Sequence, residues 1–421
     1  MMSTNQTIAF NKYLNKENVF ITGPGGTGKS FFIKKIYEDA IKKNIHINVT
    51  ALTGCAAILL DCKATTLHYW SGIGMGNLNL DKTLSQIYKY KKKEAWLKCE
   101  ILIVDEVSML SSEIFELLDG IGKKIRKNKK PFGGIQLIFS GDFHQLPPIS
   151  YTKFCFDIPL WKECFKNEII FTHNFRQSED DDYKNILSEI RNETLSDKSK
   201  KLLLECKDKI PPNNINPTIL YPIKRLSDNN NNKENDNLNT ETRIYKMDYL
   251  KNTPKNIETE LLKQKKNLMA EETLILKIGS QVMCIVNLEQ ENGIINGSQG
   301  KVINFTENNE PIVRFIYKDI VKIISCHTWY NDKYEDYGLV QIPLILAWSI
   351  TIHKSQGITL DYATINIGSD IFECGQSYVA LSRVKGLKGL YIKAIDFNKI
   401  RTNKKVKEYY DNLINLPSCD F

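Results

Sequence analysis

The chain has 421 residues, of which 42% are hydrophobic, and its 57 Lys and Arg against 49 Asp and Glu give a formal net charge of +8. This composition excludes a disordered or fibrous protein and predicts a globular chain of roughly two to four domains. The positive charge permits a polyanionic partner but is equally typical of a solvated surface.

Other features of the composition bear on the compartment. No run of apolar residues is long enough for a membrane-spanning helix, and the N-terminus, MMSTNQTIAF, lacks the layout of a signal peptide. The ten cysteines are scattered without C-x-x-C spacing, which favours reduced thiols over a zinc site or a disulfide framework. We therefore expect an intracellular protein, in the nucleus or cytoplasm, that does not bind membranes.

The first predicted element is a short apolar strand at 18–22, and a glycine-rich loop follows it. The loop, GPGGTGKS, matches the pattern G-x-x-x-x-G-K-[ST] and leads into a segment with apolar residues at helical spacing. A loop in this setting binds nucleotide phosphates, because the helix dipole and the backbone amides point at the ligand. The predicted nucleotide-binding residues are Gly23, Pro24, Gly25, Gly26, Thr27, Gly28, Lys29 and Ser30. Lys29 would reach the β- and γ-phosphates, and the Ser30 hydroxyl would hold Mg²⁺.

Three further strands are predicted at 46–52, 100–106 and 135–143, alternating with helices. This alternation predicts a parallel sheet with helices on both faces and a ligand site at the carboxyl ends of its strands. Asp105 and Glu106 end one strand, where Asp105 would hold the metal ion and Glu106 would act as the base. Gln145 follows the next strand and would contact the γ-phosphate of ATP.

The remaining segments are less regular. Apolar residues at helical spacing predict a helix at 111–128, with Ser111 or Ser112 as its N-cap. The αβ alternation is interrupted at 62–97, and the stretch 210–240, with its run of Asn, is typical of a loop or linker. Short β-type runs between about 277 and 340 predict a small β-barrel inserted in a larger α/β domain.

Nine motifs in a fixed order link these segments to a known family. They are Gln6 ahead of the loop, GPGGTGKS, TALTGCAA, TTLHYWSGIG, DEVSM, GDFHQLPP, FRQ, AWSITIHKSQGITLD and YVALSRVKGL. In order and spacing they resemble superfamily 1B DNA helicases, most closely the petite-integration-frequency (Pif) helicases, which are related to RecD. One departure is His144, which stands where the family commonly has an aromatic residue.

The resemblance implies an α/β fold with two RecA-like parallel-sheet cores of the P-loop NTPase type. It places the first core at 1–61 and 98–178 and the second at 179–280 and 340–421. It also implies a small wedge insertion at 62–97 and an inserted Src-homology-3-like β-barrel at 281–339. Arg176 and Arg383 would supply positive charge to the transferring phosphate, Gln6 would read adenine, and Gly357 would lie near the nucleotide.

The implied activity is an ATP- and Mg²⁺-dependent helicase that moves 5′ to 3′ on single-stranded DNA and unwinds duplexes in replication, repair or recombination. Its partners would be single-stranded DNA and duplex junctions, with G-quadruplex DNA left open, and the free protein would be a monomer. Residues expected on the DNA path are Thr53, Thr66, His68, His144, His353, Ser355, Gln356 and Thr359. Two alternatives remain: an RNA or RNA/DNA-hybrid helicase, because backbone contacts and base stacking do not distinguish RNA from DNA, and a nucleic-acid-binding scaffold without motor activity.

Overall fold

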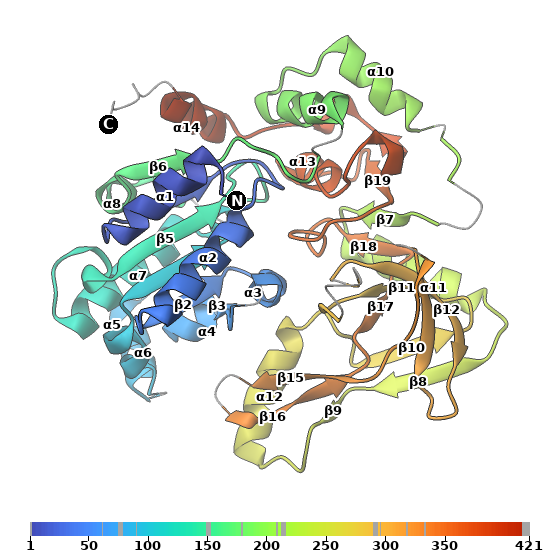
Figure 1. The fold of residues 1–421 in the computed structure, drawn as a ribbon, viewed down its shortest axis with the longest axis horizontal. Helices are drawn as coiled ribbons and strands as arrows, with labels where there is room; N and C mark the ends of the chain where they lie inside the picture. The colour runs from blue at the N-terminus through green and yellow to red at the C-terminus, as the bar shows by residue number, and fades with distance from the viewer. Residues whose placement is uncertain are drawn as a thin grey trace.

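The computed structural model describes residues 2–60, 62–74, 79–89, 91–148, 153–177, 180–207, 209–211, 216–288, 294, 296–316, 319–331 and 334–414. Within these ranges, two α/β parts face each other and a β-rich part is attached to the second (Figure 1). None of the helices in the described part of the chain is long and apolar enough to cross a membrane.

The first α/β part is built on a six-stranded parallel sheet in the order β3-β2-β4-β5-β1-β6. From edge to edge the strands are β3 (Thr65–Thr66), β2 (Ile47–Ala51), β4 (Ile101–Asp105), β5 (Gln136–Gly141), β1 (Val19–Thr22) and β6 (Asn167–Ile170). The four strands predicted from the sequence all form, because their apolar runs are buried under helices on both faces.

Helices cover both faces of this sheet. On one face, α1 (Thr4–Leu14), α2 (Lys29–Lys42) and α3 (Gly54–Leu60) share a core with Val49 and Ile103. On the other face lie α4 (Leu67–Ser71), α5 (Leu80–Lys89), α6 (Lys93–Lys98), α7 (Ser112–Arg126) and α8 (Pro159–Cys164). The predicted helix is α7, and Ser111 is its N-cap, since the hydroxyl accepts a hydrogen bond from the backbone N–H of Ile114.

The second α/β part has a four-stranded parallel sheet in the order β18-β7-β19-β20. Its strands are β18 (Ser349–Thr351), β7 (Thr218–Tyr221), β19 (Ala363–Ile367) and β20 (Leu390–Ile395). Around it lie α9 (Asp181–Asn192), α10 (Asp197–Glu205), α11 (Lys224–Asp236) and α13 (Gln376–Leu381). Both parallel sheets of the expected fold class are therefore present.

The β-rich part contains the antiparallel sheet β14-β13-β12-β11-β17, which agrees with the expected inserted β-barrel. Its strands are β11 (Gln281–Cys284), β12 (Gln299–Phe305), β13 (Pro311–Phe315), β14 (Val321–Ile323) and β17 (Leu344–Leu346). Beside it, β8 (Thr242–Lys246) pairs with β10 (Thr273–Lys277), and β9 (Asp248–Tyr249), β15 (His327–Asn331) and β16 (Tyr334–Gln341) form a three-stranded sheet under α12 (Lys255–Asn267). β8, β9 and β10 fall in the range assigned to the second core but pair outside its parallel sheet, and the domain limits stay a prediction.

The interpretation of 210–240 as a loop or linker was wrong. β7 and α11 occupy most of it, while 212–215 lies outside the described residues. Asparagine is a poor helix former, but tertiary hydrogen bonds hold α11 in place. Asn231 Nδ2 donates to Ser349 O at 2.8 Å and its Oδ1 accepts from Ser349 N at 2.8 Å, while Asn235 bonds the Ser280 hydroxyl at 2.8 Å.

The last helix, α14 (Lys404–Ile414), crosses back from the second α/β part to the first (Figure 1). Val406 and Tyr410 belong to the core under the first sheet. The Tyr410 hydroxyl lies 2.5 Å from Thr22 Oγ1 and accepts a hydrogen bond from Phe143 N at 3.1 Å. The two α/β parts are thus connected by packing as well as by the chain between them.

Candidate active site

The phosphate-type loop lies between β1 and α2, as its sequence predicts. Gly28 is the N-cap of α2 with φ of 81°, and Gly23 has φ of 140°. A Cβ on Gly23 would lie 2.3 Å from Phe171 O, and one on Gly26 would lie 2.5 Å from the Arg176 side chain. Both the backbone conformation and the close packing therefore require glycine here.

Lys29 begins α2 and turns back over the loop. Its Nζ donates to Gly23 O at 2.7 Å and to Pro24 O at 3.0 Å. Burial lowers the pKa of Lys29, whereas Asp142, Glu106 and Asp105 act in the opposite direction. The two backbone carbonyl oxygens thus hold the Lys29 ammonium group beside the loop, and a phosphate oxygen can take their place as its acceptor.

The two acids follow β4 at the same sheet edge. Burial raises the pKa of Asp105, while the neighbouring Ser140 hydroxyl and the charge of Lys29 act in the opposite direction. Burial, together with the neighbouring charge of Asp105, raises the pKa of Glu106 to about 7. Glu106 has a left-handed backbone with φ of 56°, and its Oε2 accepts a hydrogen bond from Gln356 Nε2 at 2.9 Å. Gln356 follows β18, so this bond joins the two α/β parts.

Arg176 and Arg383 face the loop from the other side. A Cβ placed on Gly25 would lie 3.4 Å from both Arg176 Nη1 and Arg383 Nη2. Burial lowers the pKa of Arg176 to about 9, with the adjacent Arg383 adding to the effect, and burial also lowers the pKa of Arg383. Arg383 is held by hydrogen bonds to Val379 O at 2.9 Å and to Ser382 Oγ at 2.7 Å. Two guanidinium groups so close together favour a bound anion.

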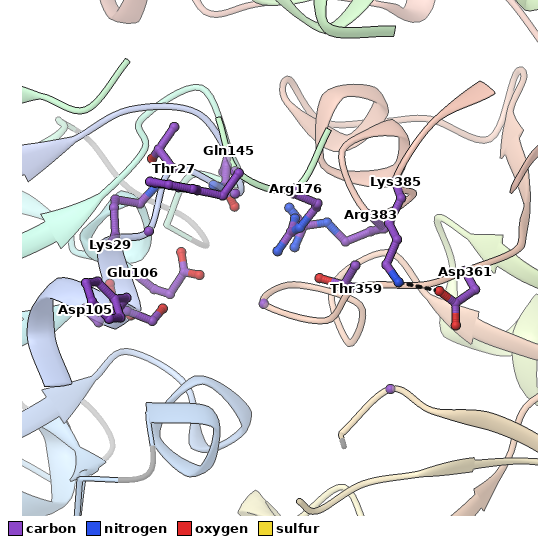
Figure 2. Close-up of a pocket in the computed structure, with 18 of the residues that line it drawn as sticks. Thr27, Lys29, Asp105, Glu106, Gln145, Arg176, Thr359, Asp361, Arg383 and Lys385 are labelled. Carbon is purple, nitrogen blue, oxygen red and sulfur yellow. Dashed lines mark hydrogen bonds and ion pairs between the residues drawn. The ribbon is translucent and has the colours of Figure 1, made fainter. Parts of the chain in front are cut away.

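A cavity of about 610 Å³ lies between these two groups of side chains (Figure 2). Lys29, Asp105, Glu106 and Gln145 come from the first α/β part, and Arg176 and Arg383 stand opposite them. The other lining residues are Gly25, Gly26, Thr27, Gly28, Ser30, Phe31, Phe175, Gly297, Ser298, Gly357, Thr359, Asp361 and Lys385. The structure thus gathers most of the predicted nucleotide residues around one cavity, whereas Gly23 and Pro24 lie in the same loop outside its lining. Thr359, which was expected on the DNA path, lines this cavity.

Gln6 lies behind the loop, outside the lining of this cavity. Its Oε1 accepts from Ser3 N at 2.9 Å in a capping box of α1, and its Nε2 is 3.4 Å from Thr27 O. In this arrangement the buried amide supports the loop. Its adenine-reading role stays a prediction.

The residues expected on the DNA path are divided between half-buried and buried positions. Thr53 and Thr66 accept hydrogen bonds from Ala56 N and Tyr69 N at the starts of α3 and α4, and His68 is half-buried. His353 is also half-buried and stacks at 6.5 Å on Phe372, which is 59% exposed. Ser355 is fully buried, with its hydroxyl donating to Ile352 O, so its side chain presents no surface to a strand.

The expected contact of His144 with DNA does not fit its placement. The side chain is 5% exposed and stacks on the Tyr410 ring at 4.7 Å. Burial lowers the pKa of His144 to about 3, so the imidazole is neutral at physiological pH. The helix α14 covers this residue, and no pattern in the sequence indicated that contact.

A buried network behind the loop was also missed. Asp142, whose pKa is lowered by the charge of Arg191 against the effect of burial, is 2.5 Å from the Arg191 guanidinium on α9. Arg191 donates to the Tyr378 hydroxyl at 3.1 Å, and that hydroxyl accepts from Gly25 N at 3.4 Å. The polar residues at 141–145 were a signal in the sequence, but their partners lie about 50 to more than 200 residues away and could not be assigned.

Comparisons with known proteins identify the family. The family model described as PIF1-like helicase matches residues 1–201, and that of the DNA helicase Pif1 2B domain matches 261–305. The crystal structure of Pif1 helicase from Candida albicans is 31% identical, with a TM-score of 0.80 over 98% of this chain and 99% of that one. The chain belongs to the PIF1-like helicase family.

Two other PIF1-like helicases bear on the comparison. The Pif1 helicase from Bacteroides in complex with ADP-AlF3 and ssDNA is 29% identical, with a TM-score of 0.70 over 99% of this chain and 98% of that one. The ATP-dependent DNA helicase PIF1 of Xenopus laevis is 35% identical over 98% of this chain. The chain spans 64% of the length of that frog protein.

Proposed function

We propose that this protein is an ATP-hydrolysing DNA helicase that moves 5′ to 3′ along single-stranded DNA and separates duplexes during replication, repair or recombination. The observation that carries the proposal is the cavity in which Lys29 and Glu106 of the first α/β part face Arg383 of the second, with Arg176 from the segment between β6 and α9 beside it. A triphosphate bound there contacts both parts, so its hydrolysis changes the force that holds them together.

Five of the lining side chains have a stated role in this proposal. Lys29 and the amides of 25–29 hold the phosphates, and the two arginines stabilise charge on the transferring phosphoryl group. Glu106 accepts a proton from the attacking water, for which its raised pKa is suited. Gln145 has a buried Oε1 without a hydrogen-bond partner among the described residues and would detect the γ-phosphate.

Mg²⁺ fits the same cavity. Among the described residues no three His, Cys, Asp or Glu side chains gather at one point, so a cation here needs phosphate and water oxygens as well. The Ser30 hydroxyl and the Asp105 carboxylate supply the hard oxygen donors that Mg²⁺ prefers when it binds with a nucleotide. The ion would neutralise charge on the phosphates, and the protein would fix its position through Asp105.

The strand would cross the face that carries Thr53, Thr66, His68 and His353. The exposed Phe372 beside His353 offers a ring on which a base can stack without sequence preference. The related Bacteroides helicase binds ssDNA, which supports this substrate. The free protein would act as a monomer at duplex junctions inside the cell.

A strand-displacement assay with matched tails tests the proposal. We expect unwinding with ATP and Mg²⁺ when the duplex carries a 5′ single-stranded DNA tail and little when the tail is 3′. Substrates with an RNA tail, an RNA/DNA hybrid or a G-quadruplex, measured beside the first, define the preferred nucleic acid. Equal unwinding from both tails, or faster unwinding from RNA tails, contradicts the proposal, and ATP-independent binding alone supports a scaffold.

A further inference from the structure

A second cavity, of about 570 Å³, lies at the free edge of the first sheet. There, β3 covers only Thr50 and Ala51 of β2, while β4 pairs with the whole of β2 from Ile47 to Ala51. The first half of β2 therefore has a neighbouring strand on one side only, among the strands that the structure describes.

The backbone of this half-strand is oriented for pairing. Just outside the two ends of β2, His46 O accepts from Glu100 N and Leu52 N donates to Asp105 O. The backbone N–H and C=O groups of the even-numbered residues in this segment therefore point toward β4. The direction of the backbone N–H and C=O groups alternates along a strand, so those of Ile47 and Val49 point toward the open side of β2. Unpaired strand edges of this kind are templates for another extended chain.

Helices from both faces of the sheet line a groove at this edge. Tyr37 and Ile41 of α2 form one wall, and Tyr69, Trp70 and Ala95 of α4 and α6 form the other. An added strand would send alternate side chains into these two apolar walls. The buried Trp70 Nε1 has no acceptor among the described residues, which leaves a donor for a polar group in the groove.

The charge of the groove selects its occupant. Lys63, Lys91 and Lys92 surround it, and its described lining contains no acidic side chain. A second copy of this chain would bring the same lysines to the edge and be repelled. Single-stranded DNA matches the charge, and its phosphates can accept from backbone N–H groups, but it lacks the alternating N–H and C=O groups that pair along a β-strand. An acidic peptide matches both the charge and the strand edge. We propose that this groove binds an extended acidic and apolar peptide segment of a partner protein, as an additional strand beside β2.

The groove lies at the amino-terminal half of β2, whereas the nucleotide cavity follows the carboxyl ends of β1 and β4. Because the strands are parallel, the two sites are at opposite ends of the sheet. The peptide site is thus independent of the proposed ATP-driven activity. A partner bound in the groove leaves the nucleotide cavity open.

Fluorescence anisotropy with the full chain tests the proposal. The probe is the labelled peptide Asp-Glu-Ile-Val-Ile-Val-Asp-Glu, and the control peptide has Lys at the four acidic positions. We expect the acidic peptide to bind at least ten-fold more tightly than the basic one. Hydrogen exchange should show slower exchange at the amides of Ile47 and Val49 when the acidic peptide is bound.

Two sets of variants locate the site. Lys63→Glu with Lys91→Glu, or Ala95→Trp, should weaken binding at least ten-fold and leave ATP hydrolysis unchanged. Lys16→Glu with Lys166→Glu changes the same charge at exposed positions away from the groove and should have less than a two-fold effect. The proposal is overturned if the acidic and basic peptides bind with equal affinity. It is also overturned if the groove variants and the control variant bind the acidic peptide equally well. If an oligo-dT probe loses affinity for the groove variants alone, the groove binds single-stranded DNA and the proposal is overturned. If the protein forms a dimer that the groove variants alone abolish, the groove binds a second copy of the chain and the proposal is overturned.

Discussion

Glu106 receives its hydrogen bond from Gln356, a residue of the opposite α/β part. This single bond of 2.9 Å connects the proposed catalytic base to the loop after β18, which also carries His353 on the expected DNA path. Sequence motifs predicted both residues separately, because each belongs to a recognisable pattern. Their contact could not be predicted, since it depends on how the two parts meet.

Gln356→Ala should lower the DNA-stimulated turnover of ATP at least ten-fold and change KM for ATP less than three-fold. A hydrogen bond to a charged group contributes about 1.5–3 kcal/mol, and here it orients the carboxylate more than it binds the nucleotide. Steady-state ATPase titrations with and without single-stranded DNA measure both quantities. If turnover with DNA stays at the wild-type value, Gln356 has no positioning role.

His144 makes folding stability depend on pH. In the unfolded chain a histidine has a pKa near 6.5, whereas burial lowers the pKa of His144 to about 3 in the folded protein. Between these values the unfolded state binds more protons, so folding stability falls as the pH falls from about 6.5 toward 3. His144→Phe, which restores an aromatic ring on Tyr410, should reduce the loss between pH 6.5 and 5 by about 2 kcal/mol. Urea unfolding of both proteins at each pH tests this, and parallel pH profiles would show that the residue does not cause the loss.

At the level of elements, β1, β2, β4 and β5 of the first sheet were predictable because each is a short apolar run ending in polar residues. The edge strands β3 and β6 were not predicted, since Thr65–Thr66 and Asn167–Ile170 carry no such run. The helix α11 was not, since Asn-rich sequence favours loops and its stability comes from partners distant in the sequence. The pairing of β8, β9 and β10 was not predictable either. β8 and β9 carry only exposed and half-buried residues, and β10 alternates exposed with buried ones, so their patterns do not say which neighbour they join.

The asparagines of α11 provide a direct test of this explanation. Asn231→Ala should lower the free energy of unfolding by about 1–3 kcal/mol, because it leaves the buried Ser349 N–H without its acceptor. Asn232→Ala, at an exposed position of the same helix, should raise it by a few tenths of a kcal/mol through helix propensity alone. Denaturant melts of the two variants measure the difference. Equal effects would mean that propensity, not tertiary bonding, decides the conformation of α11.

For the whole molecule, the order of motifs predicted two α/β parts around one nucleotide, and the cavity has residues from both. The connections that hold the parts together were not predicted. Asp142, Arg191 and Tyr378 link the parts through buried polar contacts, and Tyr410 of α14 reaches Thr22 in the first sheet. Asp142 and Tyr378 lie in recognisable motifs, but the sequence does not say which partners they or Tyr410 contact, because each partner is distant in the sequence.

Arg383→Ala tests whether the two parts act on one nucleotide. The guanidinium is 2% exposed, fixed by its own helix and directed at the loop with Arg176 beside it. Its charge is needed most when charge develops on the transferring phosphate, so the variant should bind ATP within about three-fold of wild type. Its DNA-stimulated hydrolysis should fall by about 10³-fold or more.

Arg176→Ala should behave alike, while Lys388→Ala, a lysine on the same part as Arg383 but outside the cavity lining, should hydrolyse ATP normally. Nucleotide affinity and ATPase rates with and without an oligonucleotide separate the two effects. An Arg383→Ala protein with the normal DNA-stimulated rate would remove this arginine from the active site, and with it the proposal that both parts act on one nucleotide.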